Sequence, residues 1–212
     1  MPMKIIQQGA EAILYLDKFE GKEVLVKERI EKGYRVPDLD KTMRRQRTKN
    51  ENRLLERARR AGVHVPRVLE LEEFKIIMEY IKGDKLKNTL DSYDKTKRMQ
   101  VYKLIGESIA SLHSSSVIHG DLTTSNMILK NSKPGAYELY LIDFGLGRFS
   151  QKIEDQAVDL HLLYEALKAA HFKRLEETWN TLLNVYKDKY TRSKEVSKQI
   201  EKIKKRRRYL GD

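Results

Sequence analysis

Two short polar segments of the chain carry residues that suit phosphoryl transfer. The first, His119–Asn126, reads H-G-D-L-T-T-S-N and places Asp121 five residues before Asn126. The second, Asp143–Gly145, reads D-F-G, and a short apolar run lies beside each segment. Phosphoryl transfer needs metal ions that hold the triphosphate and a carboxylate near the attacking oxygen. The two segments therefore predict a site for a phosphate chain and magnesium.

Each of the three polar side chains has an expected role. We expect Asp143 to bind magnesium that bridges the phosphates, and Asn126 to give a neutral oxygen to a second magnesium ion. Asp121 would orient an attacking hydroxyl or water and accept its proton. This D-x-x-x-x-N spacing, followed by D-F-G, resembles the catalytic and metal-binding loops of protein kinases. Two ordinary polar loops are the alternative, but both motifs in this order are hard to obtain by chance.

A lysine on a predicted strand is expected to join them. Lys27 ends the run V-L-V-K, where kinases place the lysine that holds the α- and β-phosphates. That lysine needs a helix glutamate as its ion-pair partner. Glu51 precedes Leu54 and Leu55 by three and four residues, so it shares their apolar helix face, whereas Glu56 points elsewhere. An ordinary surface lysine in a strand is the alternative.

A weaker motif predicts where the adenine ring would bind. The run M-E-Y-I-K-G, from Met78 to Gly83, resembles a kinase hinge. Backbone groups of Glu79 and Ile81 would then hydrogen-bond the adenine edge. A buried edge strand that ends at a glycine turn explains the same residues equally well.

The chain departs from most kinases at several positions. The turn expected to cover the phosphates, at Gly9 and Ala10, has one glycine where most kinases have three. Gly120 stands where many kinases have an arginine that pairs with a phosphorylated activation loop. Thr123 stands where serine/threonine kinases usually have a lysine on the γ-phosphate. About ten residues separate Gly145 from the next predicted helix, so the long activation segment that holds peptide substrates is missing.

The elements that must position these residues form a sheet-rich front and a helical rear. Strands are predicted at 12–16, 23–27, 68–71 and 75–80, with a hairpin turn at 21–22 and one helix at 40–61. Further helices are predicted at 95–113, 155–170 and 172–190, and short strands at 127–129 and 139–142 with a turn at 133–135. We expect an α+β, protein-kinase-like fold with a front lobe at 1–81 and a reduced rear lobe at 82–212.

Two of these helices, at 95–113 and 172–190, should contribute core residues to the rear lobe. Apolar residues recur at helical spacing in both. On the helix at 95–113 they are Val101, Ile105, Ile109 and Leu112. On the helix at 172–190 they are Phe172, Leu175, Trp179, Leu182 and Tyr186.

Charge points to an anionic partner. The net charge is +12, and it is concentrated in segments 41–60 and 187–208, which carry +7 and +8. Nucleic acid is the leading candidate, and two solvated helix faces are the alternative. The chain has no cysteine, which fits the cytoplasm, and no apolar run long enough to predict a membrane span.

Taken together, the motifs resemble the small atypical kinases of the KEOPS complex. The resemblance covers essentially the whole chain. It rests on Tyr34–Asp40 (Y-R-V-P-D-L-D), Arg47–Glu51 (R-T-K-x-E), His119–Asn126, Asp143–Gly147 (D-F-G-L-G), Asp155–Leu160 (D-x-A-V-D-L) and the basic run Lys204–Arg208.

This resemblance implies a function and partners that the residues alone do not. It implies binding of ATP and Mg²⁺, autophosphorylation and ATP hydrolysis, in support of threonylcarbamoyladenosine synthesis at position 37 of tRNA. The threonylcarbamoyl-transferase subunit would bind the rear lobe and a basic tail at about 203–212, and a small KEOPS subunit would bind the front lobe. We expect tRNA to contact the basic segments 41–60 and 187–208.

Two other functions compete with this one. A stand-alone kinase of the RIO type, or a small-molecule phosphotransferase, would use the same loops. A non-catalytic RNA-binding or scaffold protein would explain the charge, but it has no need of the five residues Lys27, Glu51, Asp121, Asn126 and Asp143. The tail itself could reach a partner or tRNA, or it could be a disordered, solvated end.

Overall fold

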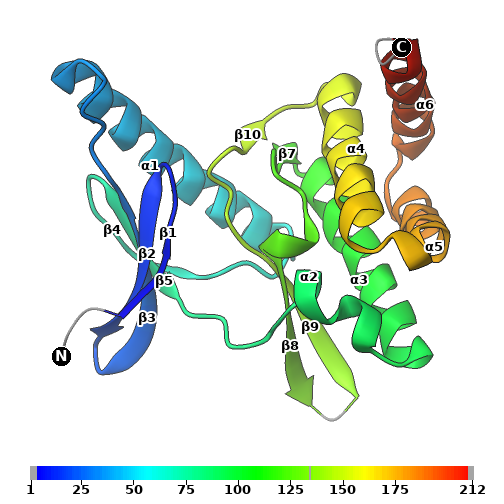
Figure 1. The fold of residues 1–212 in the computed structure, drawn as a ribbon, viewed down its shortest axis with the longest axis horizontal. Coiled ribbons are helices and arrows are strands. Elements are labelled where there is room, and N and C mark those ends of the chain that lie inside the picture. Colours follow the sequence, from blue (N-terminus) through cyan, green and yellow to red (C-terminus); the bar gives the residue numbers. More distant parts are fainter. Residues whose placement is uncertain (1–3, 134, 210–212) are drawn as a thin grey trace.

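A computed structural model describes residues 4–133 and 135–209, and of 207–209 the backbone alone. Its first part is a five-stranded antiparallel sheet in the order β1-β2-β3-β5-β4 (Figure 1). The strands are β1 Lys4–Gln8, β2 Ala12–Phe19, β3 Lys22–Arg29, β4 Val68–Leu71 and β5 Lys75–Glu79. The sequence analysis did not predict β1, and the turn between β2 and β3 falls at Glu20 and Gly21, one residue earlier than expected.

Helix α1, Pro37–Arg60, packs against β4 and β5 of the sheet and also contacts the second part of the molecule (Figure 1). It begins three residues before the predicted start because Pro37 fits the first helical turn, where no backbone N–H is needed. It ends before Gly62, whose φ of +81° suits glycine. Its buried face includes Glu51, Leu54 and Leu55. The helix therefore carries a buried carboxylate into the space beside the sheet.

The second part is mainly helical. It contains β6 Asp84–Lys85, α2 Leu86–Thr89, α3 Lys95–Ser114, β7 Val117–Ile118, β8 Met127–Lys133, β9 Ala136–Leu141, β10 Arg148–Phe149, α4 Ile153–Ala170, α5 Leu175–Lys189 and α6 Ser193–Tyr209. Helix α3 packs against α5, and α4 packs against α6. The β10-β7 pair contacts α1, and β7 also contacts α4, whereas the β6-β8-β9 sheet packs against α2 and α3. The predicted turn at 133–135 includes Pro134, which lies outside the described residues.

The rear core contains most of the predicted apolar residues. All four predicted residues of α3 are fully buried, and so are Leu182 and Tyr186 of α5. The prediction for Phe172 is wrong, since this side chain is 68% exposed. The reason is that Phe172–Arg174 form a 3₁₀ turn, so the α-helical repeat begins only at Leu175.

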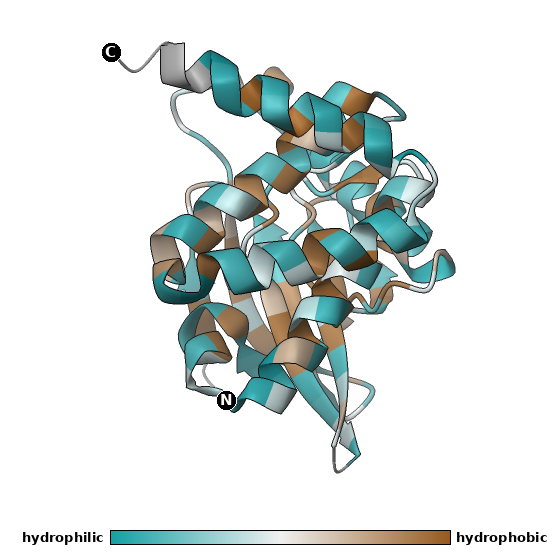
Figure 2. Ribbon diagram, turned by 90° about the vertical axis from the view of Figure 1, so that its right-hand side faces the viewer, coloured by the Kyte–Doolittle hydropathy of each residue, from teal (hydrophilic) through white to brown (hydrophobic). Residues whose placement is uncertain are grey.

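Helix α6 gives the basic C-terminal segment a packed, helical backbone. Its Val196 and Ile200 are buried, and its apolar turns alternate with hydrophilic ones in Figure 2. Lys204 lies over the rings of Tyr164 and Trp179, at 4.4 and 5.6 Å from their centroids. The predicted tail at 203–212 is therefore helical as far as Tyr209, and its last three residues lie outside the described part. None of the helices described is long and apolar enough to cross a bilayer.

Candidate active site

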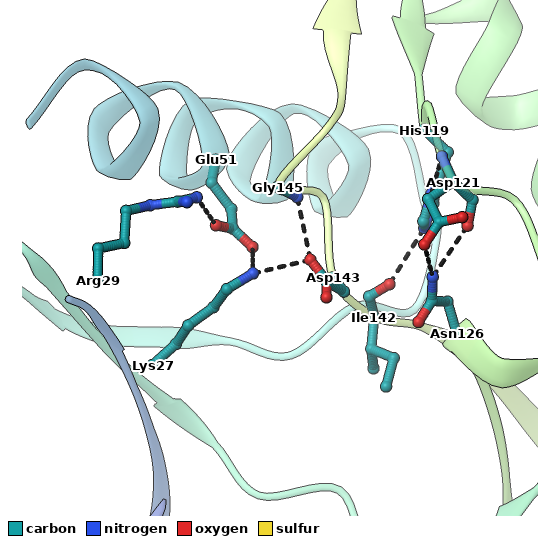
Figure 3. Close-up of polar contacts among 9 residues, drawn as sticks. All are labelled: Lys27, Arg29, Glu51, His119, Asp121, Asn126, Ile142, Asp143 and Gly145. Atoms are coloured by element: carbon teal, nitrogen blue, oxygen red, sulfur yellow. Dashed lines mark hydrogen bonds and ion pairs between the residues drawn. The ribbon is translucent and has the colours of Figure 1, made fainter. Parts of the chain in front are cut away.

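Four charged side chains from three elements meet between the sheet and α1 (Figure 3). Lys27 of β3 places its Nζ 2.6 Å from Oε1 of Glu51 and 2.7 Å from Oδ1 of Asp143. Arg29, two residues further along β3, places Nη2 2.5 Å from the other carboxylate oxygen of Glu51. Lys27, Arg29 and Glu51 are buried, whereas the side chain of Asp143 is 48% exposed. Asp143 is thus the member that can reach a ligand.

The partners keep this cluster ionised. Burial lowers the pKa of Lys27, but the charges of Glu51 and Asp143 raise it by more, so its pKa is above the ordinary value. Burial likewise raises the pKa of Asp143, but the charge and hydrogen bond of Lys27 lower it more, so its pKa is below the ordinary value. A cationic lysine therefore faces an anionic aspartate at neutral pH.

The backbone around Asp143 is strained and internally braced. Asp143 has a φ of +62°, a conformation that non-glycine residues rarely adopt. The N–H of Gly145 donates to Oδ1 of Asp143 at 3.2 Å, and the N–H of Gly147 donates to the Phe144 carbonyl at 2.9 Å. Strain of this kind persists where the surroundings fix it, and it gathers at functional sites.

Asp121 and Asn126 lie on the neighbouring loop. The amide nitrogen of Asn126 donates to Oδ2 of Asp121 at 2.8 Å and to its backbone oxygen at 2.9 Å. The carbonyl of Asn126 accepts from the N–H of Ile142 at 3.0 Å. That last bond places Asn126 directly beside the strand end that carries Asp143.

A buried aspartate of α4 holds the start of this loop. Both oxygens of Asp159 are used, one accepting from the N–H of His119 at 2.8 Å and the other from the N–H of Gly120 at 2.9 Å. Gly120 has a φ of +81°, and a Cβ there would collide with the carbonyl oxygen of Leu146. An arginine at position 120 is therefore excluded by the backbone of this chain.

All ten sequence-predicted site residues line two adjoining cavities. The inner cavity, about 320 Å³, is bounded by Lys27, Glu51, Met78, Glu79, Ile81, Asn126 and Asp143. The outer cavity, about 440 Å³, is bounded by Gly9, Ala10 and Asp121, and it shares Lys27 and Asp143 with the first. The N–H of Glu79 already donates to the Arg67 carbonyl at 2.8 Å, so Glu79 can offer its carbonyl instead.

The free oxygens of this site suit magnesium. Asn126 uses its nitrogen on Asp121, which leaves its side-chain oxygen available, and Asp143 retains Oδ2. Such neutral and anionic oxygens are what Mg²⁺ prefers, usually from one or two side chains together with substrate phosphates. Within the described residues no group of three or more acidic or histidine side chains could hold a metal alone. The residues therefore fit a metal that arrives with a nucleotide.

The sequence analysis missed three residues of the site. Arg29 lies two residues after Lys27, and alternate residues of a strand share a face, so the signal was present. Glu11, which forms ion pairs at the outer cavity, and Asp159 gave no such signal, because their partners lie 24 to 40 residues away in the chain.

A small antiparallel sheet, one long helix and a D-x-x-x-x-N loop beside a D-F-G loop define a protein-kinase-like protein with a reduced rear lobe. The RIO domain model matches residues 18–157. Rio2 kinase from Chaetomium thermophilum, solved as an ADP/Mg²⁺-phosphoaspartate complex, has a TM-score of 0.65 over 96% of this chain and 70% of its own, at 16% identity. The fold predicted from sequence is confirmed.

Relatives in sequence narrow the class. The KEOPS complex subunit Bud32 of Pyrococcus abyssi is 42% identical over 98% of this chain and 96% of its own length. A probable bifunctional tRNA threonylcarbamoyladenosine biosynthesis protein of Methanosarcina acetivorans is 41% identical over 98% of this chain, which spans 36% of that longer relative. The chain therefore belongs to the RIO domain family of atypical kinases, in the branch that includes Bud32, and the resemblance to KEOPS kinases is confirmed.

Proposed function

We propose that this chain is an ATP- and Mg²⁺-dependent kinase and ATPase, and that it acts as the kinase subunit of a KEOPS complex. In that role it supports threonylcarbamoyladenosine synthesis at position 37 of tRNA. The observation that carries the proposal is the bond of Lys27 to both Glu51 and Asp143, at 2.6 and 2.7 Å. This contact sets a phosphate-binding cation directly beside an exposed carboxylate.

The inner cavity would hold the nucleotide. Glu79 and Ile81 would bind the adenine edge, and Lys27 would hold the α- and β-phosphates. Asp143 and Asn126 would hold magnesium, which neutralises the charge that develops on the phosphates. Gly9 and Ala10 would cover the phosphates from the turn between β1 and β2. We place the boundary of the two lobes at residues 81 and 82, between β5 and β6.

Asp121 would act on the attacking group. Its carboxylate is held by the side-chain amide of Asn126 at 2.8 Å, at the wall of the outer cavity. From there it would accept the proton of a serine or threonine hydroxyl, or of water, as the oxygen attacks the terminal phosphate. Serine or threonine phosphorylation and ATP hydrolysis thus use the same base.

The acceptor must be positioned by something other than an activation segment. Only residues 146–152 lie between Gly145 and α4, and two of them, Arg148 and Phe149, pair with β7. That leaves no room for a peptide platform of the usual kind. A partner protein would position the acceptor hydroxyl or the attacking water. This requirement favours a chain that acts inside a complex.

The proposed partners are those that the resemblance to KEOPS kinases implies. The transferase subunit would bind the rear lobe and the tail at 203–212, and a small KEOPS subunit would bind the front lobe. Segments 41–60 and 187–208 would contact tRNA, and the setting would be cytoplasmic. The bifunctional relative supports the first contact, because this chain spans only 36% of it and its name includes tRNA threonylcarbamoyladenosine biosynthesis.

The competing functions are less well supported. A stand-alone RIO-type kinase or small-molecule phosphotransferase would share the fold and loops, but the near full-length match is to a KEOPS subunit. A scaffold without catalysis would not need a buried Lys27–Glu51 pair at 2.6 Å.

ATP turnover provides the test. It would be measured for the isolated chain and again with the transferase subunit and tRNA, and we expect it to rise on assembly. Asp143→Ala should abolish it without loss of the fold. Turnover that survives this substitution would refute the active-site assignment. A chain that never co-purifies with a transferase subunit, yet phosphorylates a free small molecule rapidly, would favour the stand-alone kinase.

A further inference from the structure

The outer cavity contains more positive charge than the predicted catalytic residues explain. Besides Lys27, its wall includes Arg29 from β3 and Arg47 from α1. Glu11, from the turn between β1 and β2, also lines it. Neither arginine belongs to the set of residues that phosphate chemistry predicted from the sequence, yet both face the cavity that contains Asp121.

Arg29 has an unused donor in a buried place. Its side chain is 4% exposed, and its Nη2 binds Glu51 at 2.5 Å. Its Nε is buried and has no hydrogen-bond partner among the described residues. A buried guanidinium group without its full set of acceptors is costly. Arg29 therefore keeps, beside the outer cavity, hydrogen-bonding capacity that the described residues do not use.

Glu11 now serves as the anion for the second arginine. One of its oxygens lies 2.5 Å from Nη1 of Arg47, and the other lies 3.3 Å from Nη2 of Arg35. Burial raises the pKa of Glu11, but the two arginines lower it more, so this carboxylate is ionised. Its side chain is 42% exposed, and it sits on a turn, so it can leave without opening the core.

The chain also lacks the groups that usually bind the transferred phosphate. Thr123 stands in place of the lysine that contacts it in serine/threonine kinases, and the covering turn has one glycine, Gly9. We propose that Arg29 and Arg47 form a phosphate-binding subsite beside Asp121, and that the bound phosphate replaces Glu11 on Arg47. The inference rests on the proposed function and adds to it the residues that bind a phosphate beside Asp121.

Two ligands could supply this phosphate. One is the terminal phosphate of ATP, which passes from the inner cavity toward Asp121. The other is a phosphate on the acceptor, which would enter the outer cavity directly. Binding measurements separate the two, because ADP lacks the terminal phosphate and inorganic phosphate can represent an acceptor.

The experiment measures three affinities of the full chain in the presence of Mg²⁺. The ligands are a non-hydrolysable ATP analogue, ADP, and inorganic phosphate added with saturating ADP. Arg47→Ala should weaken the ATP analogue by about tenfold or more, since it removes a charge-assisted hydrogen bond, and change ADP by less than about twofold. Arg29→Lys, which keeps the charge beside Glu51, should weaken the analogue several-fold. Glu11→Gln should strengthen it, because a competing anion is removed.

Two control variants match these changes. The side chain of Arg174 is 38% exposed, close to the 35% of Arg47, and its carboxylate partner, Glu177, lies 4.0 Å away. Arg174→Ala should therefore leave nucleotide affinity unchanged. Glu73, which pairs with Arg45 of α1 outside the cavities, provides the control Glu73→Gln. Neither residue lines either cavity.

Each result has a clear meaning. If Arg47→Ala loses affinity for the ATP analogue alone, the bound phosphate is the terminal phosphate of the nucleotide. If it loses affinity for inorganic phosphate alone, the bound phosphate belongs to an acceptor. Unchanged affinity for all three ligands would overturn the subsite, and unchanged affinity in Glu11→Gln would overturn the replacement of Glu11. Turnover of hydrolysable ATP by Asp143→Ala, measured in a separate assay, tests the proposed function on its own.

Discussion

The side-chain nitrogen of Asn126 lies 2.8 Å from a carboxylate oxygen of Asp121, so the proposed metal ligand and the proposed base are one hydrogen-bonded unit. The same nitrogen also donates to the Asp121 carbonyl at 2.9 Å. Both bonds fix the carboxylate and turn the Asn126 oxygen away from it. The same two bonds thus fix the positions of the proposed base and of the proposed metal ligand.

Substitution of Asp121 should separate binding from catalysis. Asp121→Asn should lower the rate of phosphoryl transfer by roughly 10²- to 10⁴-fold, the usual contribution of a general base. Affinity for Mg²⁺ and ATP should stay close to wild type, because the proposed metal ligands Asn126 and Asp143 remain. Single-turnover kinetics with saturating ATP would measure the rate, and a full rate in this variant would exclude Asp121 as the base.

Loss of Glu51 should destabilise the fold, unlike loss of the nearby Glu56. Glu51→Ala leaves Lys27 and Arg29 buried without their shared carboxylate, which should cost about 3–5 kcal/mol. Glu56 pairs with the exposed Arg60 at 3.4 Å, so Glu56→Ala should cost less than about 1 kcal/mol. Chemical unfolding of both variants checks this, and equal losses would contradict the burial argument.

Gly120 should tolerate no side chain. Gly120→Ala combines a left-handed φ of +81° with a collision at the Leu146 carbonyl, so both stability and turnover should fall. Gly21 has a similar φ of +77° with open space around it, so Gly21→Ala should cost only the conformational penalty, about 1–2 kcal/mol. Thermal unfolding and ATP turnover of the pair would show whether the collision matters.

Asp159 should make stability sensitive to acid. Burial raises its pKa, but His113 and the backbone N–H of His119 lower it more, so the folded-state pKa is below the ordinary 3.8. Its carboxylate therefore stabilises the fold above that ordinary pKa, and this contribution is lost as pH falls through the lower folded value.

The acid effect is measured as a slope. Melting temperatures between about pH 2.5 and 5 should fall less steeply in Asp159→Asn than in the wild type. Asp38→Asn, at an exposed position in the first turn of α1, is the control and should keep the wild-type slope. Because only the slope is compared, a lower overall stability of Asp159→Asn does not affect the test. Equal slopes in all three proteins would contradict the assignment.

Truncation of α6 should separate packing from nucleic-acid binding. Removal of all residues after Lys202 deletes Ile203, which packs on the core, and Lys204, which lies over Trp179. We expect a lower melting temperature as well as weaker tRNA binding. Removal of residues 207–212 keeps Ile203 and Lys204 in place and should reduce the salt dependence of tRNA affinity, by about 2 in log–log slope for two lost arginines. An unchanged tRNA affinity at low salt would contradict the role of the tail.

The sequence predicted what periodicity and short motifs encode. The buried face of α3 follows from helical spacing, whereas the pairing of Lys27 with Glu51 and the loops of Asp121 and Asp143 follow from the resemblance to kinase motifs. Strand β1 was missed because Ile5 and Ile6 are adjacent and both exposed, so no alternation marks a strand.

Other features depend on contacts between distant residues. Phe172 was misassigned because a 3₁₀ turn cannot be told from the first turn of a helix by spacing alone. Asp159 and Glu11 are recognised only through partners such as Gly120 and Arg47, which the fold brings near. Such contacts leave no periodic trace in a single sequence.

The pairing of β10 with β7 has a consequence for control of the enzyme. Arg148 and Phe149 pair with Ile118 and Val117, immediately before the loop that contains Asp121, and α4 begins four residues later. A phosphate added here would have no long flexible segment to reorder. Position 120 is a glycine, so it provides no arginine that could bind that phosphate. If the chain acts inside a complex as proposed, assembly can switch its activity without any movement of this segment.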